Sequence, residues 1–451
     1  MIYEKAETDW LASESIFYNE KLGIISNCIN EVIDYGNLCF HPEGLNNYLQ
    51  FGYSVLGQTL IKDVKFLQAN QKIYKNDRGK IIVEDKQDPV EEKIGIESRS
   101  EDVFDYMAYV IERECQKARK KIILPLSGGW DSRLLAHFCP RKQDILAFTY
   151  GISKESSHSS EVLLAKRTAE NLQIRWEEIK LGKYHTLLDE WDKLYGVATH
   201  AHGMYQMEFY QKILKDIPAD EGTVLSGIIG DAWAGTVYVD RIKGIEDFVK
   251  LGYTHGINAD LSCSNLSCTY ELREEFFVKN RERLKDRNWN VVFAMRNKLL
   301  LLSYLLKIPQ VLGMTTVQPF LDLDLAIKMV NLPWSEKEGR KWQRDYLEKH
   351  HLLFENDMGF MDRTNMLDLK ALLNVPLRPL DANLLSEVIR KDYVEWININ
   401  VGKKPILYGK ARSISGKVKN AIGMVYDKKI LKAYSGYLVL KPIENLLKRR
   451  L

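Results

Sequence analysis

The residues best suited to chemistry form one short run, Pro125-Leu126-Ser127-Gly128-Gly129-Trp130-Asp131-Ser132-Arg133. Gly128 and Gly129 let the backbone turn sharply and approach an anion, while Ser127 and Ser132 offer hydroxyl donors. A helix after this run would present its first amides to negative charge. Asp131 adds a carboxylate that suits Mg²⁺ held against phosphates. We therefore expect a phosphate-binding loop at residues 126–132, the first loop below; the alternative is an ordinary Gly-Gly turn that caps a helix.

The first loop differs from a Walker loop, because no Gly-Lys-Ser or Gly-Lys-Thr closes it. The pattern therefore does not indicate transfer of a γ-phosphate. We expect instead a reaction that cleaves ATP between its α and β phosphates. Such a reaction releases pyrophosphate and leaves AMP on the substrate.

A second stretch again places a Ser-Gly pair and an Asp after a short apolar segment, in Val224-Leu225-Ser226-Gly227-Ile228-Ile229-Gly230-Asp231. Two such loops at the carboxyl ends of parallel strands can face one crevice. Asp231 would then supply a second carboxylate to the same Mg²⁺. Residues 226–231 are called the second loop; taken alone, a plain turn explains them equally well.

The segments around these loops alternate between strand and helix patterns. A helical pattern over residues 98–119, which begins with acidic residues, leads into the first loop. The alternation predicts a parallel sheet with right-handed crossovers and flanking helices, so the expected fold class is α/β. The expected strands are 122–126, 145–150, 175–181 and 223–225, and the expected helices are 132–138 and 160–172.

Three units are expected along the chain. Residues 1–95 contain short apolar segments between turn formers, which is typical of a small, partly β module. Residues 96–365 hold both loops and, beyond about residue 288, a helical pattern with apolar segments at 291–308 and 323–330. Residues 366–451 form a basic C-terminal extension.

Length and composition are those of a soluble globular protein with two or three domains: 451 residues, 45% hydrophobic and 28% charged. No stretch reaches the roughly 20 uncharged apolar residues of a membrane span. The N-terminus lacks the basic start and apolar run of a signal peptide, so we expect a cytoplasmic location. The six cysteines are scattered, which favours reduced thiols over a disulfide framework or a zinc site.

The net charge of +3 hides an asymmetry. Residues 403–451 contain 13 Lys or Arg against Asp427 and Glu444, a local balance of +11 that leaves −8 on the rest of the chain. Such a segment suits peripheral contact with an anionic membrane surface or with an anionic substrate. A solvated basic face is the more common meaning of a charge run.

These motifs resemble the asparagine synthetase family and its relatives, which include β-lactam and lasso-peptide cyclising enzymes. The resemblance spans residues 40–350. Its stretches are Pro42-Glu43 through Tyr48-Leu49-Gln50-Phe51-Gly52-Tyr53 and Thr59-Leu60, the first loop, the second loop up to Gly235, and Gln318-Pro319-Phe320-Leu321-Asp322.

The resemblance implies an ATP-pyrophosphatase domain that uses ATP and Mg²⁺. Pyrophosphate would lie on the first loop, adenine would lie beside the strand that holds Phe148 and Thr149, and Asp131 and Asp231 would bind Mg²⁺. The implied nucleotide-binding residues are Leu126, Ser127, Gly128, Gly129, Asp131, Ser132, Phe148, Thr149, Ser226 and Gly227.

The chain departs from the glutamine-dependent members of this family at its N-terminus. Those enzymes use a Cys directly after the initiator Met, whereas this chain begins Met1-Ile2. Cys28 and Cys39 are internal and lack the free α-amine that an N-terminal nucleophile uses as its base. We therefore expect residues 1–95 to be a truncated module that resembles the end of a class II glutaminase domain and has no glutaminase activity.

The chain also departs from the family at positions that handle protons and charge. Ile228 and Ala232 stand where the family's second loop carries Glu, and neither side chain can transfer a proton. Asp357 stands where a family Lys neutralises the departing pyrophosphate. The cations that could take over that role are Lys341, Arg340 or Arg344.

His200 and His202 lie before the second loop and are the remaining candidates for a general base or a substrate contact. Neutral imidazole suits removal of a proton from an attacking amine. The alternative is that this His-x-His pair is simply polar surface. We carry His200, His202 and Lys341 forward as the candidate catalytic residues.

The expected function is an ATP-dependent carbon-nitrogen ligase that adenylates a carboxylate and passes the acyl group to ammonia or an amine. The carboxylate would belong to a small molecule or a glycan, and ammonia would come from solution or from a separate glutaminase subunit. The first alternative is a non-catalytic relative that binds nucleotide or scaffolds a partner. The second alternative is a sulfur- or tRNA-modifying enzyme, which needs a reactive Cys pair near the loop and a nucleic-acid partner. Cys139 stands alone near the loop, and we expect no nucleic-acid partner.

Overall fold

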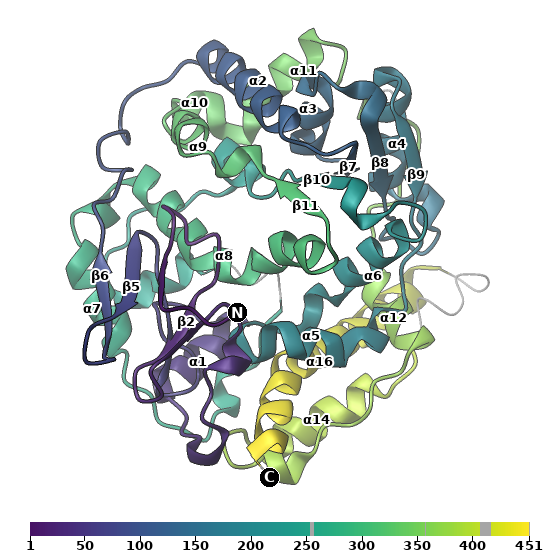
Figure 1. The fold of residues 1–451 in the computed structure, drawn as a ribbon. Coiled ribbons are helices and arrows are strands. Elements are labelled where there is room, and N and C mark those ends of the chain that lie inside the picture. Colours follow the sequence, from purple (N-terminus) through teal and green to yellow (C-terminus); the bar gives the residue numbers. More distant parts are fainter. Residues whose placement is uncertain (253–256, 357, 406–415, 451) are drawn as a thin grey trace.

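The computed structural model describes residues 1–252, 257–356, 358–405 and 416–450. Its centre is a five-stranded parallel sheet with the strand order β11-β10-β7-β8-β9 (Figure 1). The fold class expected from the sequence, α/β with a parallel sheet, is therefore confirmed. The strands are β7 (Lys121–Pro125), β8 (Ile145–Thr149), β9 (Arg175–Glu178), β10 (Gly222–Leu225) and β11 (Thr315–Val317).

The sheet is covered on both faces because its strands alternate between two cores. Ile122 and Leu124 of β7 belong to one buried cluster, whereas Ile123 between them belongs to the other. The first cluster includes residues of α2 (Ser100–Gln116), α3 (Trp130–Phe138) and α4 (Ser160–Leu172), and the second includes residues of α5 (Leu188–Tyr195) and α6 (Met204–Ile213). The short apolar strand β7 thus packs against helices on both faces of the sheet, directly before the first loop begins.

The predicted elements agree with the structure to within a few residues. The helices expected at 160–172 and 323–330 match α4 and α9 (Leu323–Val330) residue for residue. The strand expected at 175–181 ends earlier, at Glu178. No pattern in the sequence predicts β11, since three residues between helices are too few to show a period.

The N-terminal part contains short strands between turns, in two antiparallel sheets. One antiparallel sheet contains β1 (Lys5–Glu7), β5 (Gln71–Lys75) and β6 (Ile81–Asp85) in the order β1-β5-β6. A second contains β3 (Ile24–Ser26), β2 (Phe17–Asn19) and β4 (Val64–Phe66) in the order β3-β2-β4. The helix α1 (Pro42–Phe51) follows, with Pro42 in its first turn and His41 accepting a hydrogen bond from the Gly44 amide.

The C-terminal part is helical. Its elements are α7 (Glu271–Asn280), α8 (Arg287–Val311), α9, α10 (Trp334–Lys337), α11 (Lys341–Lys349), α12 (Leu367–Asn374), α13 (Ala382–Leu385), α14 (Lys391–Val401) and α16 (Gly416–Arg450). Among the described residues no helix is both long enough and apolar enough to cross a membrane.

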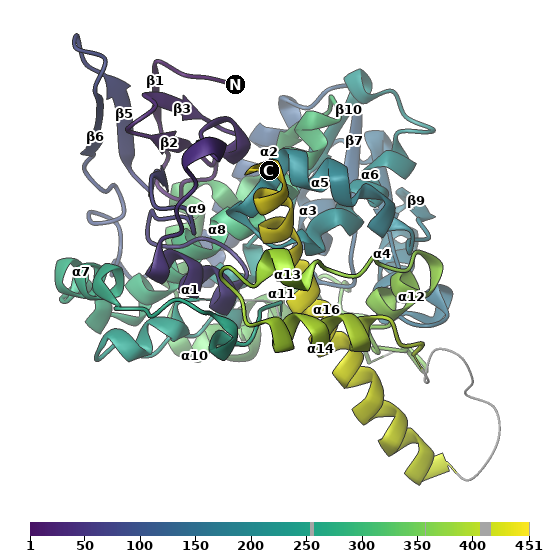
Figure 2. The same ribbon diagram turned by 90° about the horizontal axis from the view of Figure 1, so that it is seen from below.

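The end of α16 lies against the body of the molecule, between the N-terminal strands and the helices around the parallel sheet (Figure 2). Tyr434 and Tyr437 are buried there. The terminal cations have acidic partners: Arg449 pairs with Asp192 of α5, and Arg450 pairs with Glu387 at 2.5 Å. Part of the basic character of this segment is therefore used inside the fold.

The expectation that Cys139 stands alone is wrong. Its Sγ lies 3.3 Å from the Sγ of Cys115, and both side chains are fully buried. The two residues end α3 and α2, which pack against each other. Asp131 lies in the first turn of α3, about 12 Å away along the axis at 1.5 Å per residue. The thiol pair therefore lies at the opposite end of α3 from the first loop.

Candidate functional site

The first loop begins where β7 ends and is fastened to the end of β8. The Leu126 amide donates to the Phe148 carbonyl at 2.9 Å, and the Thr149 hydroxyl donates to the Leu126 carbonyl at 2.5 Å. Trp176 of β9 donates in turn to the Thr149 hydroxyl at 2.9 Å. The two residues expected beside adenine, Phe148 and Thr149, thus adjoin the loop expected to hold pyrophosphate.

The two serine hydroxyls hold the shape of the first loop. Ser127 Oγ lies 3.1 Å from Ser132 Oγ, and the Ser127 and Gly129 amides each donate to one of these hydroxyls at 3.1 Å. A Cβ on Gly128 would lie 3.1 Å from Leu164 of α4, so close helix packing also requires a glycine there. Ser127 and Gly129 are exposed, which leaves the loop open to a ligand at the start of α3.

A buried ion pair supports the loop from behind. Arg133 is fully buried, and its guanidinium donates to the Gly128 carbonyl at 3.0 Å, to the Leu352 carbonyl at 2.6 Å and to Glu355 at 3.1 Å. Trp130 also donates to Glu355, at 2.9 Å. Burial alone raises the pKa of Glu355, but the hydrogen bonds and charge of Arg133 hold it below the ordinary value. Glu355 is a residue to which sequence reasoning assigned no role.

The second loop touches the first, as expected from neighbouring parallel strands. Ser226 continues from β10 and donates its amide to the Val317 carbonyl of β11 at 2.9 Å. A Cβ on Gly230 would lie 3.1 Å from the Asp131 carboxyl carbon, and one on Gly227 would lie 3.6 Å from the Ser132 amide. Gly230 therefore has no room for a side chain, because its Cβ would also lie 2.9 Å from the Phe320 ring, whereas a Cβ on Gly227 would make only ordinary contacts.

Asp131 is buried where the two loops meet. Its Oδ1 accepts hydrogen bonds from Arg340 at 2.8 Å and from Gln343 at 3.3 Å. Burial raises the pKa of Asp131 to about 6, against the favourable charge of Arg340, and the nearby negative charge of Asp231 raises it further. Asp231 itself is exposed, and Thr236 donates to its carboxylate at 3.2 Å. The two carboxylates are therefore close enough to repel each other.

This pair fits a magnesium ion that is shared with phosphates. Mg²⁺ is commonly held by one or two carboxylates together with phosphate oxygens and water. Among the described residues no group of three or more His, Cys, Asp or Glu side chains could hold a metal by itself. Burial, and then the negative charge of Asp231, raise the pKa of Asp131, and a cation between the two carboxylates would favour their charged forms.

Of the three cations expected near the first loop, one contacts Asp131 and two are exposed to solvent. Arg340 lies beside Asp131 and stacks over the Trp130 ring at 4.9 Å. Lys341, the predicted catalytic cation, is exposed at the start of α11, as is Arg344 further along that helix. Asp357, at the family's Lys position, lies outside the described residues.

Lys298 of α8 is a cation that sequence reasoning missed. It is buried, and burial lowers its pKa to about 8 although the charge of Asp231 opposes this shift. The only available signal was a Lys in the largely apolar stretch 291–308, which also contains Arg296 and Lys307. Lys298, when charged, brings a positive charge close to the carboxylate of Asp231.

The two histidines have their described contacts elsewhere. His202 Nε2 lies 3.1 Å from Asp368 of α12, which also accepts a hydrogen bond from Tyr184 at 2.7 Å. His200 is buried, and its amide donates to the Gly52 carbonyl at 2.7 Å. These contacts tie both residues to α1 and α12 rather than to the two loops, so their catalytic role stays a prediction.

Two hollows flank the first loop, and they share Gly128 and Gly129. One of about 400 Å³ is lined by Ser127, Gly128, Gly129, Ser160, Glu161, Leu164, Glu355 and Arg363. The other, of about 290 Å³, is lined by Gly128, Gly129, Trp130, Gly235, Thr236, Gly339 and Arg340. Ile228 and Ala232, at the family's Glu positions, are buried apolar residues of the second loop region.

The burial of Asp131 predicts that this carboxylate lowers the stability of the ligand-free protein although the proposed site needs it. Because the native pKa of Asp131 is raised to about 6 from 3.8, the folded state holds a proton that the unfolded state has lost between these values. Stability of the ligand-free protein therefore falls as pH rises through that window. We expect Asp131→Asn to raise the melting temperature at pH 7, which corresponds to a free energy of unfolding about 1–3 kcal/mol higher than in the wild type. This gain in the free energy of unfolding should vanish near pH 4. A lower melting temperature at pH 7 would contradict this, and exposed Asp216→Asn is the control.

The ion pair behind the loop predicts a second stability effect. Glu355→Gln keeps the shape of the side chain but leaves the buried Arg133 without a countercharge, and we expect a loss of about 1–3 kcal/mol. Glu282→Gln removes an exposed ion pair to Lys285 and should change the melting temperature little. Equal melting temperatures for the two variants would show that Glu355 does not support the loop.

A known protein family matches the part of the chain that contains both loops. Residues 112–231, which include both loops, match the family model described as asparagine synthase. Among solved structures, an NH3-dependent NAD synthetase from Campylobacter jejuni subsp. jejuni NCTC 11168, in complex with the nitrate ion, is 17% identical over 46% of this chain and 96% of that chain, with a TM-score of 0.26. No curated protein matches the chain. Residues 112–231 are therefore similar to an asparagine synthase domain.

Proposed function

We propose that this protein adenylates a substrate carboxylate and transfers the acyl group to ammonia or an amine. The carboxylate oxygen attacks the α-phosphorus of ATP, the bond to the β-phosphate breaks, and pyrophosphate leaves. The amine nitrogen then attacks the acyl carbon and loses a proton, and AMP departs with the former carboxylate oxygen. The observation that carries the proposal is the meeting of the two loops at Asp131, beside the open start of α3.

The residues of the first loop have the role of holding the departing pyrophosphate. The amides in the first turn of α3 favour negative charge, and the fixed serine hydroxyls keep the loop in shape without substrate. Asp131 and Asp231 would hold Mg²⁺, which would neutralise phosphate charge. Phe148 and Thr149, which adjoin the first loop, would lie beside adenine. Ser226 and Gly227 of the second loop would also contact the nucleotide.

Arg340 is the proposed cation for pyrophosphate. It lines the hollow beside Gly128 and Gly129, and its 2.8 Å contact with Asp131 places it at the junction of the loops. A guanidinium remains charged at every accessible pH and forms two parallel hydrogen bonds with phosphate oxygens. Lys341 points to solvent from the neighbouring position and so competes poorly for this role.

The acceptor is proposed to differ from aspartate, because Ile228 and Ala232 replace the two acidic residues of the family's second loop. A carboxylated small molecule or a glycan fits this change. In this proposal residues 96–365 form the ligase part, residues 1–95 form a smaller module, and residues 366–451 are an extension. Nitrogen then comes from free ammonia, an amine substrate or a separate glutaminase subunit.

Exchange of labelled pyrophosphate into ATP tests the activation step without the amine. We expect exchange that depends on a carboxylate and on Mg²⁺, and a loss of about 100-fold or more in Asp131→Ala. Formation of ADP instead of AMP would contradict the proposal. Nucleotide binding without exchange, for every carboxylate tried, would favour the non-catalytic relative.

A matched pair of neighbouring cations tests the proposed role of Arg340. We expect Arg340→Ala to lower the exchange rate by about 10- to 100-fold, since a charge beside the phosphates is lost. Lys341→Ala removes an exposed charge one residue away and should stay within about twofold of the wild type. The opposite order would restore Lys341 as the catalytic cation.

A further inference from the structure

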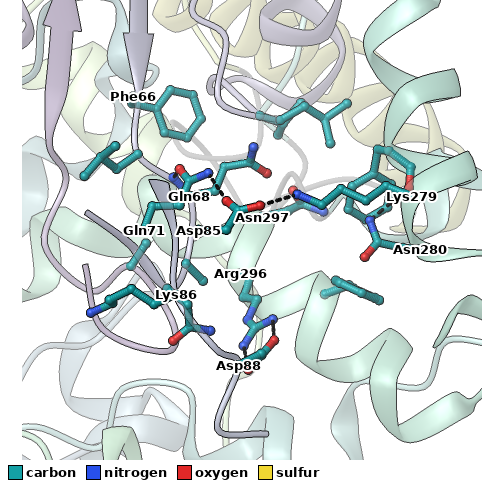
Figure 3. A pocket seen from close by; sticks show the side chains of 18 of the residues that line it. Phe66, Gln68, Gln71, Asp85, Lys86, Asp88, Lys279, Asn280, Arg296 and Asn297 are labelled. Carbon is teal, nitrogen blue, oxygen red and sulfur yellow. Dashed lines mark hydrogen bonds and ion pairs between the residues drawn. The ribbon is translucent and has the colours of Figure 1, made fainter. Parts of the chain in front are cut away.

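A cavity of about 500 Å³ lies between the N-terminal strands and the helices α7 and α8, and no residue of either loop lines it (Figure 3). Its charged side chains bind one another: Arg296 binds Asp88 through hydrogen bonds of 2.7 and 2.8 Å, and Lys279 pairs with Asp85 at 2.8 Å. These pairs join the N-terminal part to the helices, so the charges of this cavity serve packing. The buried thiols of Cys115 and Cys139 also lie away from the first loop, but two thiols in contact can react with each other.

The two thiols lie where the ends of two neighbouring helices meet. Cys115, in the last turn of α2, donates a hydrogen bond from its Sγ to Sγ of Cys139, which directly follows α3; the sulfurs are 3.3 Å apart. The two helices pack against each other. Because a disulfide bond is about 2 Å long, the sulfurs have to approach by only about 1 Å to be joined.

The thiol pair lies just below the surface. Both side chains are fully buried, but the residues that follow them, Gln116 and Pro140, are exposed. Helix ends fray, and such local openings cost much less free energy than unfolding of the whole protein. A small oxidant therefore reaches the sulfurs when the ends of α2 and α3 open.

Two cations of the turn after α3 surround the pair. The Arg141 guanidinium donates to the Cys115 carbonyl at 3.2 Å, and Lys142 Nζ donates to the His137 carbonyl at 2.8 Å. The hydrogen bond from Cys115 lowers the pKa of the Cys139 thiol, and the Arg141 amide and the charge of Lys142 also lower it, against the effect of burial. The same contact raises the pKa of Cys115. Cys139 is therefore the first of the two to become a thiolate, which is the reactive form.

The two cysteines enclose the first loop in the sequence. Residues 115–139 contain β7, the first loop and α3. A bond between the sulfurs closes a covalent ring that contains this whole segment. Such a ring restricts the unfolded chain and thereby stabilises the folded protein.

We propose that Cys115 and Cys139 form a disulfide when the protein meets a peroxide, and that this bond stabilises the segment that carries the first loop. The Cys139 thiolate attacks one oxygen of hydrogen peroxide, the O–O bond breaks, and the hydroxide that leaves takes up the proton that Cys139 had lost. Cys139 is then a sulfenic acid. The Cys115 sulfur attacks the Cys139 sulfur, the S–O bond breaks, and the oxygen takes the Cys115 proton and departs as water.

The two thiols together lose two electrons and two protons, and the peroxide is reduced to two molecules of water. This chemistry does not depend on whether the chain adenylates a carboxylate.

Mass spectrometry of the full chain after peroxide treatment tests this site. The folded, reduced protein is treated with hydrogen peroxide, the excess is removed with catalase, free thiols are blocked with iodoacetamide, and the chain is digested with trypsin without a reductant. We expect the peptide 114–117, which contains Cys115, to be linked to the peptide 134–141, which contains Cys139. We also expect the melting temperature of the oxidised protein to be about 3 °C or more above that of the reduced protein.

Two variants serve as a matched pair. Cys139→Ala should lose both the linked peptide and the rise in melting temperature, and Cys115→Ala gives the same test if Cys139→Ala fails to fold. Cys263→Ala removes another fully buried thiol, in the short helix before α7, and should keep both.

A linked peptide together with a higher melting temperature supports the proposal. Recovery of the two peptides unlinked from the treated wild type overturns it, as does a bond from Cys115 or Cys139 to a different cysteine. A linked peptide without a higher melting temperature overturns the stabilising role of the bond.

Discussion

The site depends on one constraint: a carboxylate must be kept in a crevice where its charge is unfavourable. Asp131 is buried between two loops, and its pKa is raised to about 6 by burial and by the neighbouring Asp231. The second loop approaches it closely, and Gly230 has no room for a side chain between the Phe320 ring at 2.9 Å and the Asp131 carboxyl carbon at 3.1 Å. Arg340 and Gln343 offset part of the cost. A bound cation, shared with phosphates, would stabilise the charged form of Asp131 and so offset the cost of burying it.

The fold supplies this constraint through strand order. β7 and β10 are neighbours in the parallel sheet, so the loops at their carboxyl ends meet although about 100 residues separate them. The β8 end fastens the first loop, and Arg133 with Glu355 supports it from behind. The loop is thus shaped before any ligand binds, which lowers the cost of ordering it on binding.

Much of this could be predicted from local sequence. The strand, the glycine turn and the helix at 122–138 follow from apolar runs and residue types, and the meeting of Asp131 with Asp231 follows from the parallel sheet. Contacts across long sequence separations could not be predicted from one chain. Arg340, which has a left-handed φ of 55° just before α11, contacts Asp131, whereas Lys341 is exposed. Glu355 reaches Arg133 across the fold. The Cys115–Cys139 contact likewise arises only when helices pack.

The central claim is that a carboxylate oxygen attacks the α-phosphorus of ATP. Its most direct test is mass spectrometry of the AMP formed from a substrate carboxylate labelled with ¹⁸O. The proposed mechanism predicts one ¹⁸O atom in AMP for each turnover and none in pyrophosphate. Label in inorganic phosphate, with ADP as the nucleotide product, or AMP free of label would contradict it.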